Sequence, residues 1–207
     1  MPKLTKAGIT FLILLASAGL IYALKVLQPA KRSAATTPAP PRSKGHSQAP
    51  VKIVEYIDFQ CPSCANGWQY LSQFHQQHPD ILMLEVKYFP LTTHRHAFVS
   101  ARYAECAERQ GQFWPLVDRL FQSQNQWKGS LDAEPYFQQM AQDLNLNLQQ
   151  LKSCLEDVTI EQVIRQEKMD GQALGIRSTP TYFINGKMVV GTKSLAEVLT
   201  QYVNSAF

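Results

Sequence analysis

The stretch VEYIDFQCPSCANGW, residues 54–68, places two cysteines three positions apart between an apolar run and a segment of helical character. Residues 52–59 are rich in β-branched and aromatic side chains, which predicts a buried strand. Residues 62–76 begin with a proline and carry apolar side chains at helical spacing, which predicts a helix. The two thiols therefore lie where a strand meets the start of a helix.

This joint favours a reactive thiol at Cys61. A thiol attacks a disulfide only as a thiolate, and the unpaired N–H groups and the positive dipole end of a helix start stabilise that anion. Cys64 lies three residues on, on the same helix face, and can close a ring with Cys61. We therefore predict that Cys61 is the attacking thiol and Cys64 the resolving thiol, with Pro62 and Ser63 as the active-site loop between them.

Two other roles for the cysteines are weaker. Together with two histidines they form the pattern C-x2-C-x10-H-x2-H, close to a small zinc finger, at Cys61, Cys64, His75 and His78. Both intervals are shorter than that pattern requires, and the histidines fall about 15 Å along the same helix. A purely structural disulfide across so small a ring would remove little chain entropy. We predict no metal and no cofactor.

The chain after the first helix alternates between strand and helix patterns. Residues 81–89 form a second apolar run, so residues 52–89 predict a βαβ unit with parallel strands. Residues 95–175 have the pattern of about four or five successive amphipathic helices. The pattern predicts a helical segment that follows the βαβ unit.

The last part of the chain predicts a hairpin and a helix. Asn185-Gly186 lies between two apolar runs and is a strong signal for a tight hairpin turn. Residues 194–204 predict a closing helix, with Ser194 as N-cap and Glu197 completing a capping box.

The order of these motifs resembles that of a known family. A βαβ unit with C-P-x-C at its first joint, a helical segment, and T-P before a hairpin and a last helix resemble the DsbA-like thiol-disulfide oxidoreductases of the thioredoxin-fold superfamily. The strings VEYIDFQCPSC, AECAERQGQFWPLVDRLF and GIRSTPTYFINGK are similar to those of its bacterial membrane-anchored or secreted branch. The resemblance covers roughly residues 50–205. It implies an α/β thioredoxin fold with a helical insertion at about 93–176, between the βαβ unit and the C-terminal hairpin and helix.

The resemblance also implies roles for residues outside the cysteine pair. Thr179-Pro180 matches the family's cis-proline, which packs opposite the cysteines and leaves the preceding backbone free to bind an extended client segment. Base rates alone favour a trans bond, because only about one X-Pro bond in twenty is cis. Glu55 matches a buried acid beneath Cys64 that accepts its proton. Alternation along the strand permits burial of Glu55, but it also permits an exposed position.

Ser63 departs from the strongly oxidising pattern of the family, in which a histidine at this position favours the thiolate. Serine brings no positive charge, so we expect a less depressed Cys61 pKa and a lower reduction potential. The resemblance implies a protein disulfide oxidase, with a disulfide isomerase or reductase as the alternative. An alternative of another class is a copper-binding module, since Cu(I) prefers soft thiolates. No methionine or histidine lies between Ile53 and Tyr70 to support it.

Cys106 and Cys154 lie in the helical segment without C-x-x-C spacing. We predict that they form a structural disulfide, which would persist in an oxidising compartment. Two free buried thiols are the alternative for a reducing compartment. His94 and His96 lie near the start of the helical segment, and we predict that they are solvated loop residues.

The first fifty residues differ in composition from the rest. They hold seven of the 20 Lys and Arg and none of the 16 Asp and Glu, so the remainder is slightly acidic. Residues 7–24 are uncharged and mostly apolar, which predicts a transmembrane helix within an anchor or signal segment at 1–28. The triplet at 16–18 leaves cleavage open. Residues 29–49 predict a flexible Pro/Ser/Ala linker, and residues 50–207 a single domain.

These features predict a single-pass protein of the inner membrane with its catalytic domain in the periplasm or extracytoplasmic space. Its clients are exported proteins with thiols or disulfides. The resemblance implies a quinone-linked membrane partner of the DsbB or vitamin K epoxide reductase (VKOR) type. A single domain without an obvious dimerisation segment predicts a monomer, and the acidic domain without a recognition motif argues against nucleic-acid binding.

Overall fold

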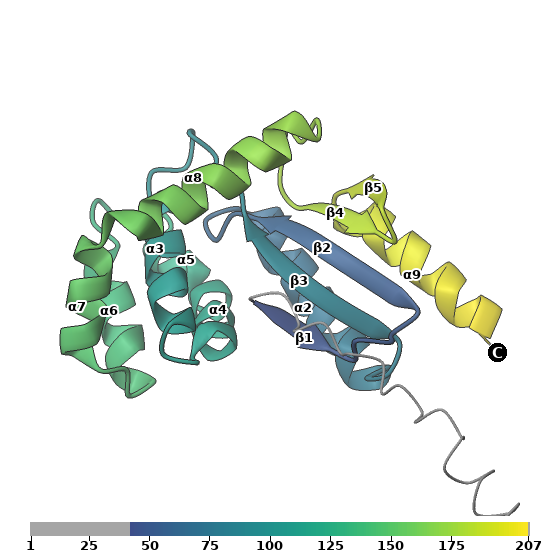
Figure 1. Ribbon diagram of the computed structural model, residues 1–207, viewed down its shortest axis with the longest axis horizontal. Helices are drawn as coiled ribbons and strands as arrows, with labels where there is room; N and C mark the ends of the chain where they lie inside the picture. Colours follow the sequence, from purple (N-terminus) through teal and green to yellow (C-terminus); the bar gives the residue numbers. More distant parts are fainter. Residues whose placement is uncertain (1–41, 207) are drawn as a thin grey trace, which may run out of the picture. The chain divides into compact units, whose positions relative to one another are not determined.

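A five-stranded mixed sheet forms the centre of the computed structural model, which describes residues 42–206 (Figure 1). Its strands are β1 Ser43–Gly45, β2 Val51–Ile57, β3 Leu82–Tyr88, β4 Thr181–Ile184 and β5 Lys187–Val190. They lie in the order β1-β3-β2-β4-β5. Only β2 and β3 among these neighbours are parallel. The strand that leads into the cysteines is therefore the central one.

The predicted βαβ unit consists of β2, helix α2 (Pro62–Gln77) and β3. Alternate residues of β2 are buried in the main core, where α2 contributes side chains such as Trp68 and Leu71. Tyr56, on the other face of β2, packs against Phe89 in a smaller cluster with ring centroids 6.3 Å apart. Because both faces are covered, β2 reads as a nearly continuous apolar run.

Six helices of the described chain separate β3 from β4, where the sequence predicts about four or five. They are α3 Ala97–Glu108, α4 Phe113–Gln122, α5 Gln124–Trp127, α6 Glu134–Asp143, α7 Leu148–Glu156 and α8 Val158–Ala173. The side chains of Asn147 and Asp157 cap α7 and α8 by accepting hydrogen bonds from backbone N–H groups. Helices α3 to α7 gather beyond one side of the sheet, and α8 leads the chain back toward β4 (Figure 1). The predicted α/β fold with a helical insertion is confirmed.

The chain closes with the predicted hairpin and helix α9 (Thr192–Ala206). Asn185 and Gly186 both have positive φ, 48° and 82°, as a tight hairpin turn between β4 and β5 requires. The predicted N-cap at Ser194 is wrong. Gly191, with φ 81°, turns the chain directly from β5 into the helix, and its carbonyl accepts a hydrogen bond from the Leu195 N–H. Ser194 therefore lies inside the first turn.

The last part of the predicted linker, 29–49, is structured. Ser43–Gly45 forms β1, which pairs antiparallel with the edge of β3. The buried Arg42 side chain donates to the Glu105 carboxylate at 2.5 Å and to the Glu167 carboxylate. Breaking such a buried network would leave charges unpaired, so the network holds the start of the domain in place. Residues 42–45 therefore belong to the folded domain and not to the predicted linker.

The predicted transmembrane helix at residues 7–24 lies outside the described residues. Within residues 42–206, no helix combines the length and the apolar character needed to cross a membrane.

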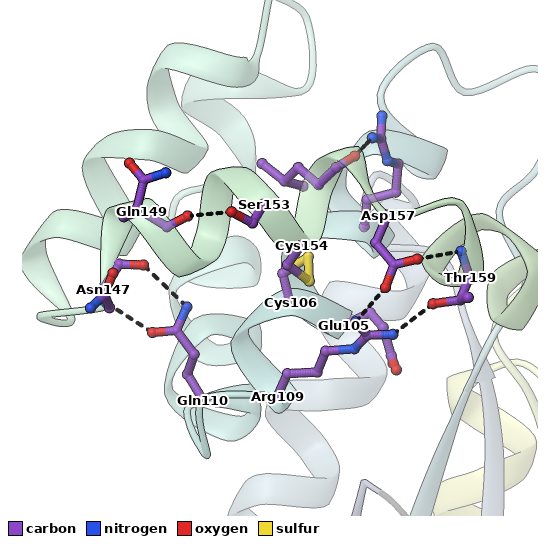
Figure 2. The surroundings of a disulfide bond; sticks show 12 residues. Glu105, Cys106, Arg109, Gln110, Asn147, Gln149, Ser153, Cys154, Asp157 and Thr159 are labelled. Atoms are coloured by element: carbon purple, nitrogen blue, oxygen red, sulfur yellow. Dashed lines mark hydrogen bonds and ion pairs between the residues drawn. A yellow bond between two sulfur atoms is a disulfide. The ribbon is translucent and has the colours of Figure 1, made fainter.

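A disulfide between Cys106 and Cys154 joins α3 to α7, with Cα atoms 5.8 Å apart (Figure 2). Polar contacts flank the bond on both sides. Arg109 donates to the Asp157 carboxylate at 2.8 Å, and the Gln110 side-chain oxygen accepts from the Asn147 N–H at 2.8 Å. The two cysteines for which the sequence predicts a structural bond are thus linked within the helical insertion.

Candidate redox site

The site begins where β2 ends and α2 starts. Cys61 is the N-cap of α2, with extended backbone, and Pro62 occupies the first turn. The Cys61 carbonyl accepts hydrogen bonds from the N–H groups of Cys64 and Ala65, at 3.1 and 3.2 Å. Both thiols are free in this structure. The local structure is therefore the predicted one, with Cys61 at the helix start and Cys64 within the first turn.

The environment of Cys61 favours its thiolate. Its pKa is lowered from 9.0 to about 5, first of all because the Cys64 thiol hydrogen-bonds to its sulfur. Thr179 and the backbone N–H groups of Ser63 and Cys64 add to this, while burial opposes it. At neutral pH, Cys61 is therefore a thiolate, the form that attacks disulfides and that leaves them readily.

Cys64 has the opposite properties. Its side chain is fully buried, and its pKa is raised well above 9.0, first by burial and then by the proton that it shares with Cys61. The nearby Glu55 carboxyl raises it further. A thiol that holds its proton this firmly needs a base before it can react, so the two cysteines differ as an attacking and a resolving thiol do.

The cis bond between Thr179 and Pro180 lies beside the attacking thiol. The Cys61 Sγ lies 3.4 Å from the Thr179 carbonyl oxygen, to which it donates in its thiol form, across 118 positions of sequence. The Pro180 carbonyl in turn accepts from the Gly191 N–H at 3.0 Å. The segment that precedes β4 is thus held against the start of α2.

Glu55 is completely buried on β2. Burial raises its pKa from 4.5 to about 8, and the nearby Tyr182 hydroxyl lowers this pKa in part. In the described chain, neither carboxylate oxygen has a hydrogen-bond partner. Because this carboxyl titrates near pH 8, it can both give a proton to a neighbouring thiol and take one from it.

Asp58 holds the loop before the cysteines, a role that was not predicted from the sequence. Its buried carboxylate accepts from the N–H groups of Gln60 and Leu91 at 2.8 and 2.9 Å, and it lies 2.8 Å from His94 Nδ1. The prediction that His94 is a solvated loop residue is therefore wrong. Two of these partners, Leu91 and His94, belong to the segment after β3, which the folded sheet brings next to Asp58.

The helical insertion also binds the cysteine loop. The Gln124 amide donates to the carbonyls of Phe59 and Cys61, at 2.8 and 3.0 Å. Gln60 accepts from the backbone N–H of His96 at 2.6 Å, and the His96 ring lies 2.9 Å from the Ser130 carbonyl. His96 is buried, so its prediction as a solvated residue is also wrong. The insertion thus fixes the loop that presents Cys61.

Ser63 and Pro62 are exposed at the surface of the site. The Ser63 carbonyl accepts from the Thr192 hydroxyl at 3.1 Å, which ties the loop to the start of α9. Within residues 42–206, no group of three or more His, Cys, Asp or Glu side chains is placed to hold a metal ion. The low pKa of Cys61 and the high pKa of Cys64 give the site an attacking thiolate and a protonated resolving thiol, as disulfide exchange requires.

Comparison with known proteins places this site in a family. Residues 37–203 match the model of the family described as Thioredoxin. The chain is similar to α-DsbA1 of Wolbachia pipientis, with 21% identity, a TM-score of 0.69 and coverage of 87% of this chain and 94% of that one. It is also similar to DsbA2 of Pseudomonas aeruginosa, with 25% identity, a TM-score of 0.61 and coverage of 80% and 96%.

A curated relative is much longer than this chain. The protein named Na(+)/H(+) antiporter NhaA 1 of Salinispora arenicola is 34% identical over 166 residues, which are 79% of this chain and 24% of the antiporter. The chain spans about a quarter of the length of the curated relatives it matches. The family match nevertheless covers nearly all of the described domain, and the helical insertion agrees with the DsbA-type structures. The chain belongs to the thioredoxin family and has the DsbA-like form of its fold.

Proposed function

We propose that this protein is a thiol-disulfide oxidoreductase that works as an oxidase, forming disulfides in exported client proteins. The observation that carries the proposal is the contrast between the two thiols, with the Cys61 pKa lowered to about 5 and the Cys64 pKa raised. A pKa of about 5 for the attacking thiol lies between about 7 in thioredoxin and about 3.5 in DsbA. Stabilising the Cys61 thiolate stabilises the reduced pair, which makes the disulfide a better oxidant.

The cycle starts from a Cys61–Cys64 disulfide. A client thiolate attacks Cys61 Sγ, the bond to Cys64 breaks, and Cys64 leaves with the electron pair and takes a proton. A second client thiolate then attacks the client sulfur of the mixed disulfide, and Cys61 leaves as a thiolate. The client loses two electrons and gains one disulfide, and the cysteine pair is reduced.

Glu55 supplies the proton that Cys64 takes in this cycle and accepts it again when the pair is reoxidised. Its burial next to Cys64 and its pKa of about 8 support this role. Thr179 and Pro180 bind the client backbone next to Cys61. The short contact between Cys61 Sγ and the Thr179 carbonyl supports that role.

The proposal includes a compartment and a partner. The Cys106–Cys154 disulfide supports an oxidising compartment, outside the cytoplasm. Residues 7–24 would anchor the protein in the inner membrane, with the catalytic domain in the periplasm or extracytoplasmic space. A quinone-linked partner of the DsbB or VKOR type would return the cysteines to the disulfide.

A reductase or isomerase is the second candidate, and Ser63 favours it. The exposed serine brings no positive charge to the Cys61 thiolate, which is therefore less stable than a neighbouring histidine would make it. The two candidates share the chemistry and differ in the direction of electron flow.

Trapping clients on Cys61 tests the exchange chemistry. Replacing Cys64 with Ser removes the resolving thiol, so mixed disulfides between Cys61 and client proteins should accumulate in cells and run as thiol-sensitive bands on a gel. The Cys61→Ser variant is the matched control and should trap nothing. Equal trapping by both variants, or by neither, would contradict an exchange enzyme.

A further inference from the structure

Tyr182 lies beside the buried acid without a role in the cycle above. It is paired with Glu55 across the antiparallel β2–β4 ladder, so both side chains point to the same face of the sheet. The tyrosine is completely buried. Within the described residues its hydroxyl has no hydrogen-bond partner of ordinary geometry, and leaving a buried hydroxyl in this way is costly.

Gly67 of α2 makes the space that this hydroxyl occupies. A Cβ atom at position 67 would lie only 2.1 Å from the Tyr182 hydroxyl oxygen. The same point is 3.3 Å from the Thr192 Oγ1. The glycine therefore allows the tyrosine hydroxyl to pass under the helix and to approach Thr192 at the start of α9.

Thr192 connects this buried group to the surface. It is partly exposed, and its hydroxyl donates to the carbonyl of the exposed Ser63 at 3.1 Å. The pKa of the Tyr182 hydroxyl is raised by burial and by Glu55, and Thr192 lowers it in part. Glu55, Tyr182 and Thr192 thus form a row of oxygen-bearing side chains that leads from the core beneath Cys64 to the surface.

We propose that the Tyr182 hydroxyl relays protons between the Glu55 carboxyl and the Thr192 hydroxyl, through the opening that Gly67 provides. The inference rests on the proposed function, because it deepens the role of Glu55 there. When the pair is reoxidised, Cys64 gives its proton to the Glu55 carboxylate and attacks the mixed disulfide at Cys61.

The relay then carries the proton from the Glu55 carboxyl to solvent. Glu55 passes its proton to the Tyr182 oxygen while the tyrosine gives its own proton to Thr192, and Thr192 releases one to solvent. No charge stays on the tyrosine, whose pKa is raised by burial and by Glu55. The Tyr182 hydroxyl has no hydrogen-bond partner in the resting site, so the relay requires Glu55 and Thr192 to approach it when the proton moves, as catalytic hydrogen bonds tighten during reaction.

Oxidation of the reduced full-length protein by oxidised glutathione tests the relay. Cys61 first forms a mixed disulfide with glutathione, and Cys64 then resolves it. The Tyr182→Phe variant should leave the first step unchanged and slow the second about tenfold at neutral pH. Tyr103→Phe, which removes the hydroxyl of another buried tyrosine, is the matched control and should change neither step.

The hydroxyl at position 192 gives a second comparison. Thr192→Val should slow resolution as Tyr182→Phe does, and Thr192→Ser, which keeps the hydroxyl, should restore the rate. The pKa of the Glu55 carboxyl, followed by carbon NMR, should rise in Tyr182→Phe, because the Tyr182 hydroxyl that lowers it is lost. This readout does not depend on activity.

Glu55→Gln separates the relay from the proposed function. If Glu55→Gln slows resolution but Tyr182→Phe changes neither that rate nor the Glu55 pKa, the relay is wrong and the role of Glu55 stands. If Glu55→Gln leaves resolution unchanged as well, the role of Glu55 in the cycle is also wrong. Equal slowing of both steps by Tyr182→Phe would show a structural effect and overturn the relay.

A glycine variant tests the opening without removing the hydroxyl. Gly67→Ala would place a Cβ on the Tyr182 oxygen, so it should slow resolution and destabilise the fold. In the Gly67→Ala/Tyr182→Phe double variant the nearest ring atom, Cζ, is at an ordinary 3.5 Å, so stability should recover while resolution stays slow. Recovery of the rate in the double variant would contradict the relay.

Discussion

The protein contains two cysteine pairs that are equally buried and chemically different. Cys61 and Cys64 are 7% and 0% exposed, and Cys106 and Cys154 are 0% and 9% exposed. The first pair is free and strongly polarised, whereas the second is bonded. Burial therefore does not decide which pair reacts.

The difference lies in what surrounds the sulfur atoms. Cys61 stands at a helix start, next to a second thiol, with a buried acid below. Cys106 and Cys154 link the last turns of α3 and α7, and the polar groups beside them pair with each other (Figure 2). A helix start and a nearby proton acceptor make Cys61 and Cys64 a reaction centre. Neither cysteine of the Cys106–Cys154 disulfide lies at a helix start in the described structure, which fits a structural cross-link.

Removing the attacking thiol should have the largest effect on activity, and removing the second pair should have almost none. Cys61→Ala should lower the rate of disulfide exchange with a model client peptide by more than about a thousandfold, because the nucleophile is lost. Replacing both Cys106 and Cys154 with Ala should leave that rate within about twofold at a temperature where the variant is folded. A comparable loss in both variants would mean that the second pair takes part in the reaction.

Removing the cross-link should instead reduce stability. The pair closes a segment of 48 positions, so its loss should lower the free energy of unfolding by up to about 4 kcal/mol in the chain-entropy account. Urea unfolding of the double Ala variant against the parent measures this. The reduction potential of the first pair should not move. A shift in that potential would show that the two regions are coupled.

The buried acid beneath the first pair predicts a pH dependence. The Glu55 pKa is raised from 4.5 to about 8, so its contribution to stability is greatest below pH 4.5 and is lost as the pH rises toward 8. The stability of Glu55→Gln relative to the parent should therefore increase by about 3 kcal/mol between pH 4.5 and 7. Urea unfolding of the reduced proteins across this range checks it. A constant difference would place the acid in a solvated site.

The sequence predicted those parts of the fold that local chemistry determines. Asn185-Gly186 specifies its hairpin turn, and the apolar run before Cys61 with the proline after it specifies a strand and a helix. Strand β1 could not be predicted, because three residues in a polar segment carry no pattern of their own. Only the buried Arg42 and the exposed edge of β3 give it a place.

The candidate site followed the same rule. The cysteine spacing identified the sulfur atoms, and the resemblance to the DsbA-like family identified the cis bond beside them. The partners that act across the fold were missed. The Asp58 carboxylate contacts the His94 ring, and the Tyr182 hydroxyl occupies the space left by Gly67. Strand register and helix packing bring each of these pairs together.

The equilibrium reduction potential of the Cys61/Cys64 pair tests the central claim most directly. The full chain would be equilibrated with a series of glutathione buffers and the reduced fraction measured. A Cys61 pKa of about 5 predicts a potential more oxidising than thioredoxin, between about −220 and −120 mV, as an oxidase requires. A value near about −270 mV would contradict the account and assign the protein to the reductases.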